Sequence, residues 1–266
     1  MGVLNVTPDS FSDGGRFTAP GAAVDHGRRL VADGADIVDV GGESTRPGAT
    51  RPLVAEELNR VVPVIEALAA DGATVSVDTM RAEVARAAVA AGATIVNDVS
   101  GGLADPGMLD VVAATEATYV CMHWRGHADR MQSLTTYDAG VVAGVCEELA
   151  VRVDACRAAG IPDDRLVIDP GVGFAKTASQ NWQLLAGLGE LETLGLPLLV
   201  GASRKSFLGT LLATDAGPRP VDEREAAGLA LTLLLAQQGV WGIRVHDVRA
   251  SADALAVWRR WEREHG

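Results

Sequence analysis

Short apolar runs that alternate with longer helical segments constrain the fold of this chain most strongly. Eight runs have the length and composition of buried parallel strands, at residues 2–6, 36–41, 74–78, 94–98, 118–123, 165–170, 197–203 and 242–246. Ala, Leu and Val recur at helical spacing after these runs, at residues 21–33, 53–70, 81–91, 106–115, 139–159, 179–188, 222–238 and 251–264. This repeated order predicts an α/β protein built from strand–helix units.

Eight such units in 266 residues have the size expected of a closed (β/α)8 barrel, also called a TIM barrel. We predict a single domain over residues 1–266, because no linker, low-complexity tract or charge block divides the chain. Four predicted helices are followed by a glycine that suits a left-handed cap, namely Gly34, Gly72, Gly92 and Gly160. An open doubly wound sheet is the alternative, but no GxGxxG fingerprint follows the first strand.

Charge and cysteine content narrow the range of partners and compartments. A net charge of −12 and a pI near 4.8 argue against nucleic-acid or anionic-membrane partners, since these need a basic footprint. The longest apolar stretch, residues 226–240, includes glutamines and is too short to span a bilayer. Cys121, Cys146 and Cys156 lack metal-type spacing, so we expect reduced thiols in a cytoplasmic protein that binds no membrane.

Polar and charged residues stand at or just beyond the carboxyl ends of nearly all the predicted strands. In a barrel these ends converge on one mouth, so residues far apart in the sequence are expected to face a single pocket. In chain order they are Asn5, Glu43, Arg46, Asp78, Asn97, His123, Asp169, Arg204, Lys205, Arg244 and His246. Their joint occurrence at one end of the barrel favours a ligand site.

Each of these residues also has a purely structural interpretation. Asp78 and Asp169 could cap the helices that follow them, and Asn97 could satisfy backbone groups of a loop. His123, taken alone, is typical of a hydrogen-bonded core histidine. The arginines and Lys205 could be solvated surface charges.

The residue types indicate a ligand with two chemical characters. Carboxylates and an amide suit a flat heterocycle that presents several N–H donors, and these are Asp78, Asn97 and Asp169. Cations suit phosphate or carboxylate, and these are Arg46, Lys205, Arg244 and His246. The sequence has no GxSxG elbow, no HExxH motif and no Cys/His metal cluster, and residues 171–177 lack the P-loop spacing. Chemistry without a protein nucleophile indicates two substrates brought together around a good leaving group.

The segments around these residues resemble the dihydropteroate synthases, a pterin-binding family of the bacterial folate pathway. In order from Gly2 to Val248, the resemblance rests on GVLNVTPDSFSDGG, VDVGGESTRPGA, VSVDT, VNDVSGG, MHWRG, IDPGVGFAKT, GASRKSFLG and RVHDV. It implies a transferase that joins 6-hydroxymethyl-7,8-dihydropterin pyrophosphate to p-aminobenzoate, with 7,8-dihydropteroate and pyrophosphate as products. It also implies Mg²⁺ as cofactor, sulfonamides as inhibitors and a homodimer.

By resemblance, the site residues divide among the parts of the two substrates. The pterin ring would be held by Asp78, Asn97, Met122, Asp169, Gly201 and Lys205. The pyrophosphate would be received by Asn5, Arg244 and His246, with Asn5 as the Mg²⁺ ligand. The p-aminobenzoate pocket would consist of Phe11, Thr45, Arg46, Pro47, Phe174, Lys205 and Ser206. The residues expected to take part in catalysis are Asp78, Asp169, Lys205, Arg244 and His246.

The mechanism that follows is dissociative. Pyrophosphate would leave the pterin methylene with help from Mg²⁺, Arg244 and His246, and the cation left behind would lie in the negative field of Asp78 and Asp169. The nitrogen of p-aminobenzoate would then attack this cation and lose a proton. Little general-base strength is needed against such an electrophile.

The first loop is expected to cover the site after the pterin binds. The glycine pair at residues 14–15 allows the backbone to fold over, and Phe11 can then enclose the amine. Asp9 and Asp13 are expected to stabilise the closed loop near the pyrophosphate. They are spaced four apart on a loop without a third ligand in sequence, which argues against a metal pair.

The sequence leaves three alternative functions and the oligomeric state open. A methyltetrahydrofolate-binding methyltransferase shares the strand-end Asp and Asn pattern, and a non-catalytic pterin-binding protein shares the pocket. A Schiff-base aldolase could use Lys205, because the neighbouring Arg204 can lower its pKa. The spacing of Trp258 and Trp261 on the last helix predicts core packing, with a dimer seam as the alternative.

Overall fold

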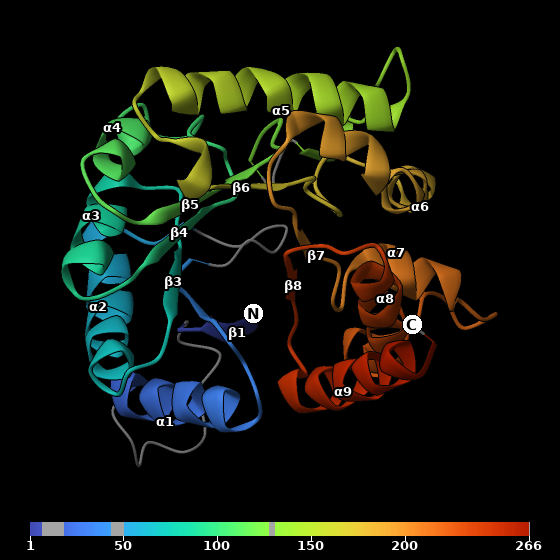
Figure 1. Cartoon of the computed structure of the whole chain (residues 1–266), viewed down its shortest axis with the longest axis horizontal. Helices are drawn as coiled ribbons and strands as arrows, with labels where there is room; N and C mark the ends of the chain where they lie inside the picture. Colours follow the sequence, from blue (N-terminus) through green and yellow to red (C-terminus); the bar gives the residue numbers. More distant parts are fainter. Residues whose placement is uncertain (7–18, 44–50, 128–130, 266) are drawn as a thin grey trace.

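The computed structural model describes residues 1–6, 19–43, 51–127 and 131–265. Its parallel strands are β1 (Gly2–Asn5), β2 (Val38–Gly41), β3 (Val75–Asp78), β4 (Ile95–Asp98), β5 (Thr118–Met122), β6 (Leu166–Asp169), β7 (Leu199–Gly201) and β8 (Gly242–Arg244). Its α-helices are α1 (Ala19–Ala32), α2 (Val54–Ala70), α3 (Ala82–Ala90), α4 (Met108–Ala113), α5 (Val141–Ala158), α6 (Ala178–Ala186), α7 (Ser206–Leu211), α8 (Glu225–Gln237) and α9 (Val248–His265). In Figure 1 the strands surround the centre of the molecule and the helices form an outer ring.

The sheet closes on itself through two short connections. Strands β1 to β6 pair in sequence order, and β7 pairs with β8, all in parallel. Between these groups, the Ile168 N–H donates to Pro197 O (2.9 Å) and the Val3 N–H donates to Val245 O (3.0 Å). These bonds join β6 to β7 and β8 to β1, so the predicted (β/α)8 barrel is confirmed.

Alternation along each strand sends side chains in turn to the barrel interior and to the surrounding helices. Ile95, Val120, Val167 and Leu199 meet in the interior as a small apolar cluster. Two residues further along the same strands, and therefore on the same inward side, stand Asn97, Met122, Asp169 and Gly201. The strand periodicity thus places these predicted site residues in the mouth, directly above an apolar floor.

The predicted elements are present with shifted ends. Each strand is shorter than its apolar run: β2, β3 and β4 begin later, β1, β5 and β8 end earlier, and β6 and β7 are shortened at both ends. The helix α7 is not among the eight helices predicted from periodicity, since six residues are too few to show a helical period. The four predicted cap glycines have φ between 85° and 108°, which confirms the left-handed caps.

The last helix departs from its expected role. Trp261 is 63% exposed and Val257 is 70% exposed, so the prediction of core packing is wrong for Trp261. Only the first turn of α9 enters the core, through Val248 and Ser251, and the described residues after Ser251 are partly or fully exposed. Trp258 is partly buried.

The three cysteines are free, as predicted. Cys121 and Cys156 are buried, and Cys146 is partly exposed. Searched over the described residues, the helices include none with both the length and the apolar character needed to cross a membrane.

Candidate active site

A chain of ionic hydrogen bonds crosses the mouth of the barrel. Arg244, at the end of β8, donates from Nε to Asp39 Oδ2 (2.6 Å) and from Nη2 to Asp78 Oδ2 (2.8 Å). Asp39 Oδ2 also accepts from Asn97 Nδ2 (3.0 Å). Gly201 is the register partner of Arg244 in the β7–β8 pair. Side chains from β2, β3, β4 and β8 are thus tied together above the apolar floor.

Burial and ion pairing together set the charges of the side chains in this hydrogen-bonded series. Burial raises the pKa of Asp78 to about 7, although Arg244 opposes the rise. Burial also works against the charge of Arg244, but Asp39 and Asp78 outweigh it and raise the pKa of the guanidinium. Arg244 is therefore a permanent cation shared by two carboxyl groups.

A second charged pair consists of Asp169, at the end of β6, and Lys205, which directly precedes α7. Burial raises the pKa of Asp169, whereas Lys205 lowers it, and burial lowers the pKa of Lys205 to about 8 against the pull of Asp169. Asp169 Oδ1 accepts from the Gly171 N–H (2.7 Å). Lys205 Nζ donates to Val172 O and lies 4.6 Å from the centre of the Phe174 ring.

An apolar cluster lines one side of the mouth. Met80, Val99 and Met122 are buried against one another, with Trp124 and Phe174 packed on them. Ligand pockets combine such an apolar wall with a few convergent polar groups. The mouth therefore offers a flat ring both a surface to stack on and carboxylates at its edge.

His246 and Asn5 stand at or just beyond the carboxyl ends of β8 and β1. His246 Nδ1 lies 3.0 Å from Ser203 Oγ, which also accepts from the His246 N–H (3.3 Å). Asn5 ends β1 and pairs in register with Gly41, whose partner on the other side is Asp78.

Two strand-end residues do not join this group, so the expectation that they face the pocket is wrong. His123 is 1% exposed, and its Nε2 lies 3.0 Å from Glu148 Oε2 while its Nδ1 lies 3.1 Å from Lys176 Nζ. This confirms the structural interpretation of a hydrogen-bonded core histidine. Arg204 forms an ion pair with Glu225 at the start of α8. Strand alternation explains His123, because the residue before it already points inward.

One predicted residue of the amine pocket stands at the start of α7. Ser206 is the exposed first residue of α7. Six predicted residues lie outside the described part of the chain, namely Asp9, Phe11, Asp13, Thr45, Arg46 and Pro47.

Two residues of this region were missed at the sequence level. Asp39 is fully buried in the middle of β2, and its Oδ1 has no hydrogen-bond partner among the described residues. A carboxylate inside an apolar run is rarely buried without a partner, so this signal was available. Lys176 is 4% exposed, and its partner His123 is too distant in sequence to be inferred.

The neutral state of His123 leads to a prediction for acid stability. Burial lowers the pKa of His123 from 6.5 to about 4, although Glu148 pulls it upward. Between these values the unfolded chain binds a proton that the folded chain does not, so stability is retained above pH 6.5 and lost as the pH falls toward 4. We expect His123 to remove up to roughly 3 kcal/mol of unfolding free energy over this window.

Denaturant unfolding of the wild type and of a His123→Asn variant at several pH values checks this. The variant lacks the titrating ring, so its unfolding free energy should fall less steeply below pH 6.5. Parallel profiles for the two proteins would contradict the assignment.

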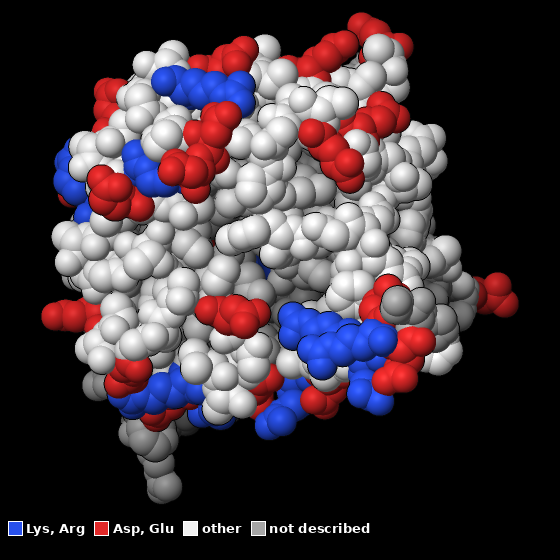
Figure 2. All heavy atoms as spheres, viewed as in Figure 1, with Lys and Arg blue, Asp and Glu red and all other residues white. Residues whose placement is uncertain are grey.

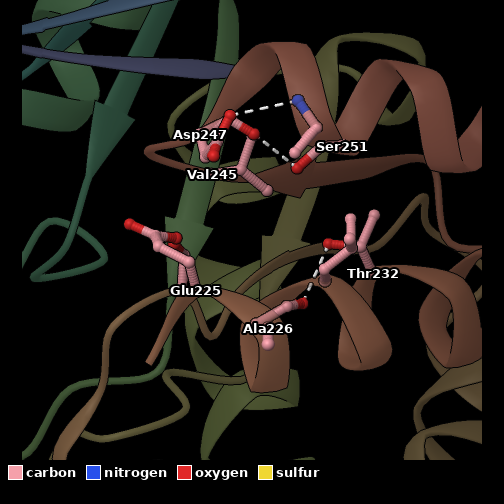
Figure 3. A pocket seen from close by; sticks show the side chains of 10 residues that line it. Glu225, Ala226, Thr232, Val245, Asp247 and Ser251 are labelled. Atoms are coloured by element: carbon pink, nitrogen blue, oxygen red, sulfur yellow. Dashed lines mark hydrogen bonds between the residues drawn. The ribbon is translucent and has the colours of Figure 1, made fainter. Parts of the chain in front are cut away.

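A small cavity outside the mouth carries no comparable chemistry. It has a volume of about 90 Å³ and lies between α8 and α9 (Figure 3). Ser251 Oγ donates to Asp247 O (2.7 Å), Thr232 Oγ1 bonds within its own helix (3.1 Å), and Glu225 is paired with Arg204. These polar groups already have partners, which is typical of a packing void.

Charged side chains of both signs are interspersed on the surface. Figure 2 shows acidic and basic side chains around the rim of one face, with mostly uncharged atoms about its centre. The cations Lys205 and Arg244 lie in the mouth of a chain whose net charge is −12.

Comparison with known proteins identifies the family. The family described as pterin binding enzyme matches residues 1–246. A dihydropteroate synthase of Mycobacterium leprae is 57% identical over 263 residues, which cover 98% of this chain and 92% of that protein.

Solved structures agree with this sequence match. A Xanthomonas albilineans dihydropteroate synthase with 4-aminobenzoic acid has a TM-score of 0.90 at 50% identity, covering 98% of this chain and 92% of the other. A Yersinia pestis dihydropteroate synthase with a sulfonamide drug complex has a TM-score of 0.89 at 42% identity, covering 98% and 93%. The chain belongs to the pterin-binding enzymes and, within them, to the dihydropteroate synthases.

Proposed function

We propose that the barrel mouth binds 6-hydroxymethyl-7,8-dihydropterin pyrophosphate beside p-aminobenzoate and joins them to 7,8-dihydropteroate, with release of pyrophosphate. The protein is then a transferase of a pterinylmethyl group. The observation that carries this proposal is the convergence of acceptors and cations on one mouth, namely Asp78, Asn97 and Asp169 with Lys205 and Arg244.

The pterin ring is assigned to the acceptors on the strand ends. Its guanidine-like edge presents parallel N–H groups, which a carboxylate such as Asp169 can accept in pairs. Asp78 and Asn97 stand on neighbouring strands in register with one another. Met122 provides the apolar surface for the ring face, and Lys205 provides a donor for the ring oxygen.

The leaving pyrophosphate is assigned to Arg244 and His246. Positive donors that face the developing charge lower the barrier to its departure. The methylene carbon left behind is positively charged, and Asp78 and Asp169 supply the negative field around it. The aromatic amine then forms the new C–N bond and gives up its proton.

Mg²⁺ fits this pocket through Asn5. Magnesium keeps several waters and takes one or two protein oxygens together with substrate phosphates, and Asn5 offers an amide oxygen at the end of β1. Within the described ranges, no three His, Cys, Asp or Glu side chains are grouped to hold a metal. A single protein ligand suits an ion held mainly by pyrophosphate, and bound Mg²⁺ would neutralise charge on that leaving group.

The amine substrate is assigned to the side of the mouth formed by Phe174, Lys205 and Ser206. Phe174 supplies an apolar wall for the benzoate ring, and the other two supply donors for its carboxylate. Sulfonamides are expected to compete for this place, because they mimic the amine. The remaining residues of this pocket stay predictions, namely Phe11, Thr45, Arg46 and Pro47, as does loop closure by Asp9 and Asp13.

We also propose that the protein is a homodimer. Helices α7, α8 and α9 expose large apolar side chains, which in a single chain would remain in contact with water. They are Leu211, Leu234, Val257 and Trp261. Sedimentation of the wild type and of a Trp261→Glu variant tests this, since the variant should sediment more slowly.

A reducing compartment suits the thiols of this chain. All three cysteines are free thiols. Two of them are buried, so their oxidation would disturb the core, and a reducing compartment prevents this. We propose a cytoplasmic location on this ground. Cell fractionation with an antibody against the protein checks it.

One assay tests the function. Purified protein with the pterin pyrophosphate, Mg²⁺ and labelled p-aminobenzoate should form labelled dihydropteroate, and a sulfonamide should raise the KM for p-aminobenzoate. Pterin binding without product would instead support a non-catalytic pterin-binding protein. Methyl transfer from methyltetrahydrofolate would support the methyltransferase alternative.

A further inference from the structure

The segment 171–174 is folded tightly between the backbone of His123 and the side chain of Lys205. Gly171 has φ of +66°, and a Cβ there would lie 2.4 Å from His123 O. Gly173 has φ of +83°, and a Cβ there would lie 2.7 Å from Lys205 Cδ. Only glycine allows both approaches, so the path of this segment is set by its neighbours on each side.

The ammonium group of Lys176 binds this segment from below. Lys176 Nζ donates to Gly171 O (3.0 Å) and to Phe174 O (3.0 Å). Its remaining proton points at His123 Nδ1 (3.1 Å). All three donors of the ammonium group thus have acceptors, and two of these acceptors are carbonyls of the same short segment.

A chain of polar side chains behind Lys176 fixes the orientation of His123. Because Nδ1 accepts from the ammonium group, Nε2 carries the proton and donates to Glu148 Oε2 (3.0 Å). Arg125 Nε is shared by both oxygens of Glu148 (3.1 and 3.0 Å). The chain of contacts therefore runs without a gap from α5 to the mouth.

The same segment holds the mouth lysine from the other side. Val172 O accepts from Lys205 Nζ, and the Phe174 ring lies under that ammonium group. Among the described residues Lys176 has no hydrogen bond or ion pair with Asp78 or Arg244, and its bonds reach the mouth through the segment it binds. These bonds therefore act on Phe174 and Lys205, while the charge of Lys176 also lowers the pKa of Asp169.

We propose that Lys176 is a positioning residue that fixes segment 171–174, so that Phe174 and Lys205 keep their places beside the amine substrate. This inference rests on the amine pocket proposed above. His123 supports the function as an acceptor for Lys176, and Glu148 supports it by selecting the tautomer of His123.

The proposed role requires a protonated Lys176 and an ionised Glu148, and the pKa values of these two groups set the pH of the assay. Burial lowers the pKa of Lys176 to about 7, with Asp169 opposing and Lys205 and Arg125 adding to the fall. Burial acts to raise the pKa of Glu148, but the bonds to His123 and Arg125 outweigh it and lower this pKa to about 2. An assay at pH 6.5, below the Lys176 pKa of about 7, keeps its ammonium form in the majority.

The test compares Lys176→Met with Arg165→Met. Methionine keeps the length of the lysine stem without its donors, and Arg165 likewise donates to loop carbonyls, but at the amino end of β6 away from the mouth. We expect Lys176→Met to raise the KM for p-aminobenzoate about tenfold, because the amine wall is displaced. The KM for the pterin pyrophosphate should rise by less than this, since Asp78, Asn97 and Asp169 stand on strands and only Asp169 is bonded to the segment, through the Gly171 N–H.

A purely structural role gives a different result. Loss of folded protein would lower kcat and the thermal midpoint while both KM values stayed unchanged, and this outcome would overturn the proposal. Arg165→Met should leave both KM values as in the wild type, and an equal rise of the amine KM in that variant would also overturn it.

Two variants of His123 test whether Lys176 needs the hydrogen-bond acceptor that His123 provides. Asparagine can place an acceptor where Nδ1 stood, so His123→Asn should keep the amine KM near the wild-type value, whereas His123→Leu should raise it. Equal effects of the two changes would contradict the role of the acceptor. A wild type that forms no dihydropteroate would instead refute the proposed function, so the two failures are distinct.

Discussion

An Arg244→Met variant is expected to form dihydropteroate about 10³-fold more slowly than the wild type. Arg244 is the permanent cation of the mouth, and its pKa is raised because Asp39 and Asp78 outweigh the effect of burial. In the proposed mechanism it faces the charge that develops on the leaving pyrophosphate, an interaction that is strongest in the transition state. The turnover number at saturating substrate measures this, because weaker substrate binding alone would raise only KM.

The same change is expected to lower the free energy of unfolding by about 3–5 kcal/mol. Asp39 is fully buried and Asp78 is 12% exposed at the side chain, so both would lose a partner without gaining water. Denaturant unfolding of the two proteins gives the difference. Arg249→Met is the matched control, because its ion pair with Asp33 (3.1 Å) is solvent-exposed and is worth at most about 1 kcal/mol.

A second substitution separates stability from chemistry. In Arg244→Met with Asp39→Asn, the buried carboxylate is replaced by a neutral amide, so part of the lost stability should return. Turnover should stay low, since the guanidinium group proposed to face the leaving pyrophosphate is still absent. A double variant that regained wild-type turnover would show that Arg244 acts only by holding the barrel together.

Strand alternation explains how much of the site could be predicted from the sequence. Asp78, Asn97 and Asp169 end apolar runs and share an inward face, so a barrel brings them together without further information. His123 breaks the same rule, because it follows Met122 and must point toward the helices. Position near a strand end does not tell whether a side chain points into the mouth or toward the helices. The odd or even place of the residue within its strand does.

Residues whose importance arises from packing could not be found in this way. Lys176 stands in a loop that has an imperfect resemblance to a phosphate-binding motif, and its partners come from β5 and from its own loop. Its burial depends on how α5, α6 and the barrel pack, which no local pattern encodes. Asp39 differs, since an inward carboxylate two residues before Gly41 was visible in the sequence once the strand had been assigned.

We expect Asp169→Ala to weaken binding of the pterin pyrophosphate by about a hundredfold or more. Asp169 is 7% exposed and accepts from the Gly171 N–H, which leaves carboxylate lone pairs for two parallel ligand bonds. Bonds to a charged group contribute about 1.5–3 kcal/mol each, and a ligand donor left without a partner adds to the loss. Calorimetric titration of the pterin substrate without p-aminobenzoate measures the affinity directly.

Asp98 supplies the matched control, because it is also a buried aspartate at a strand end. It accepts from the Ser100 N–H (2.8 Å) and hydroxyl (2.6 Å), from the Gly102 N–H (2.7 Å) and from the Tyr119 hydroxyl (2.7 Å). These donors occupy its oxygens on the helix side of the sheet, so Asp98→Ala should cost stability and leave pterin affinity within about threefold. Tyr119→Phe removes one of those donors, and this variant replaces Asp98→Ala as the control if Asp98→Ala does not fold. Equal loss of pterin affinity in the Asp98 or Tyr119 variant would show that strand-end carboxylates act by shaping the barrel, and the assignment of Asp169 to the pterin would then be wrong.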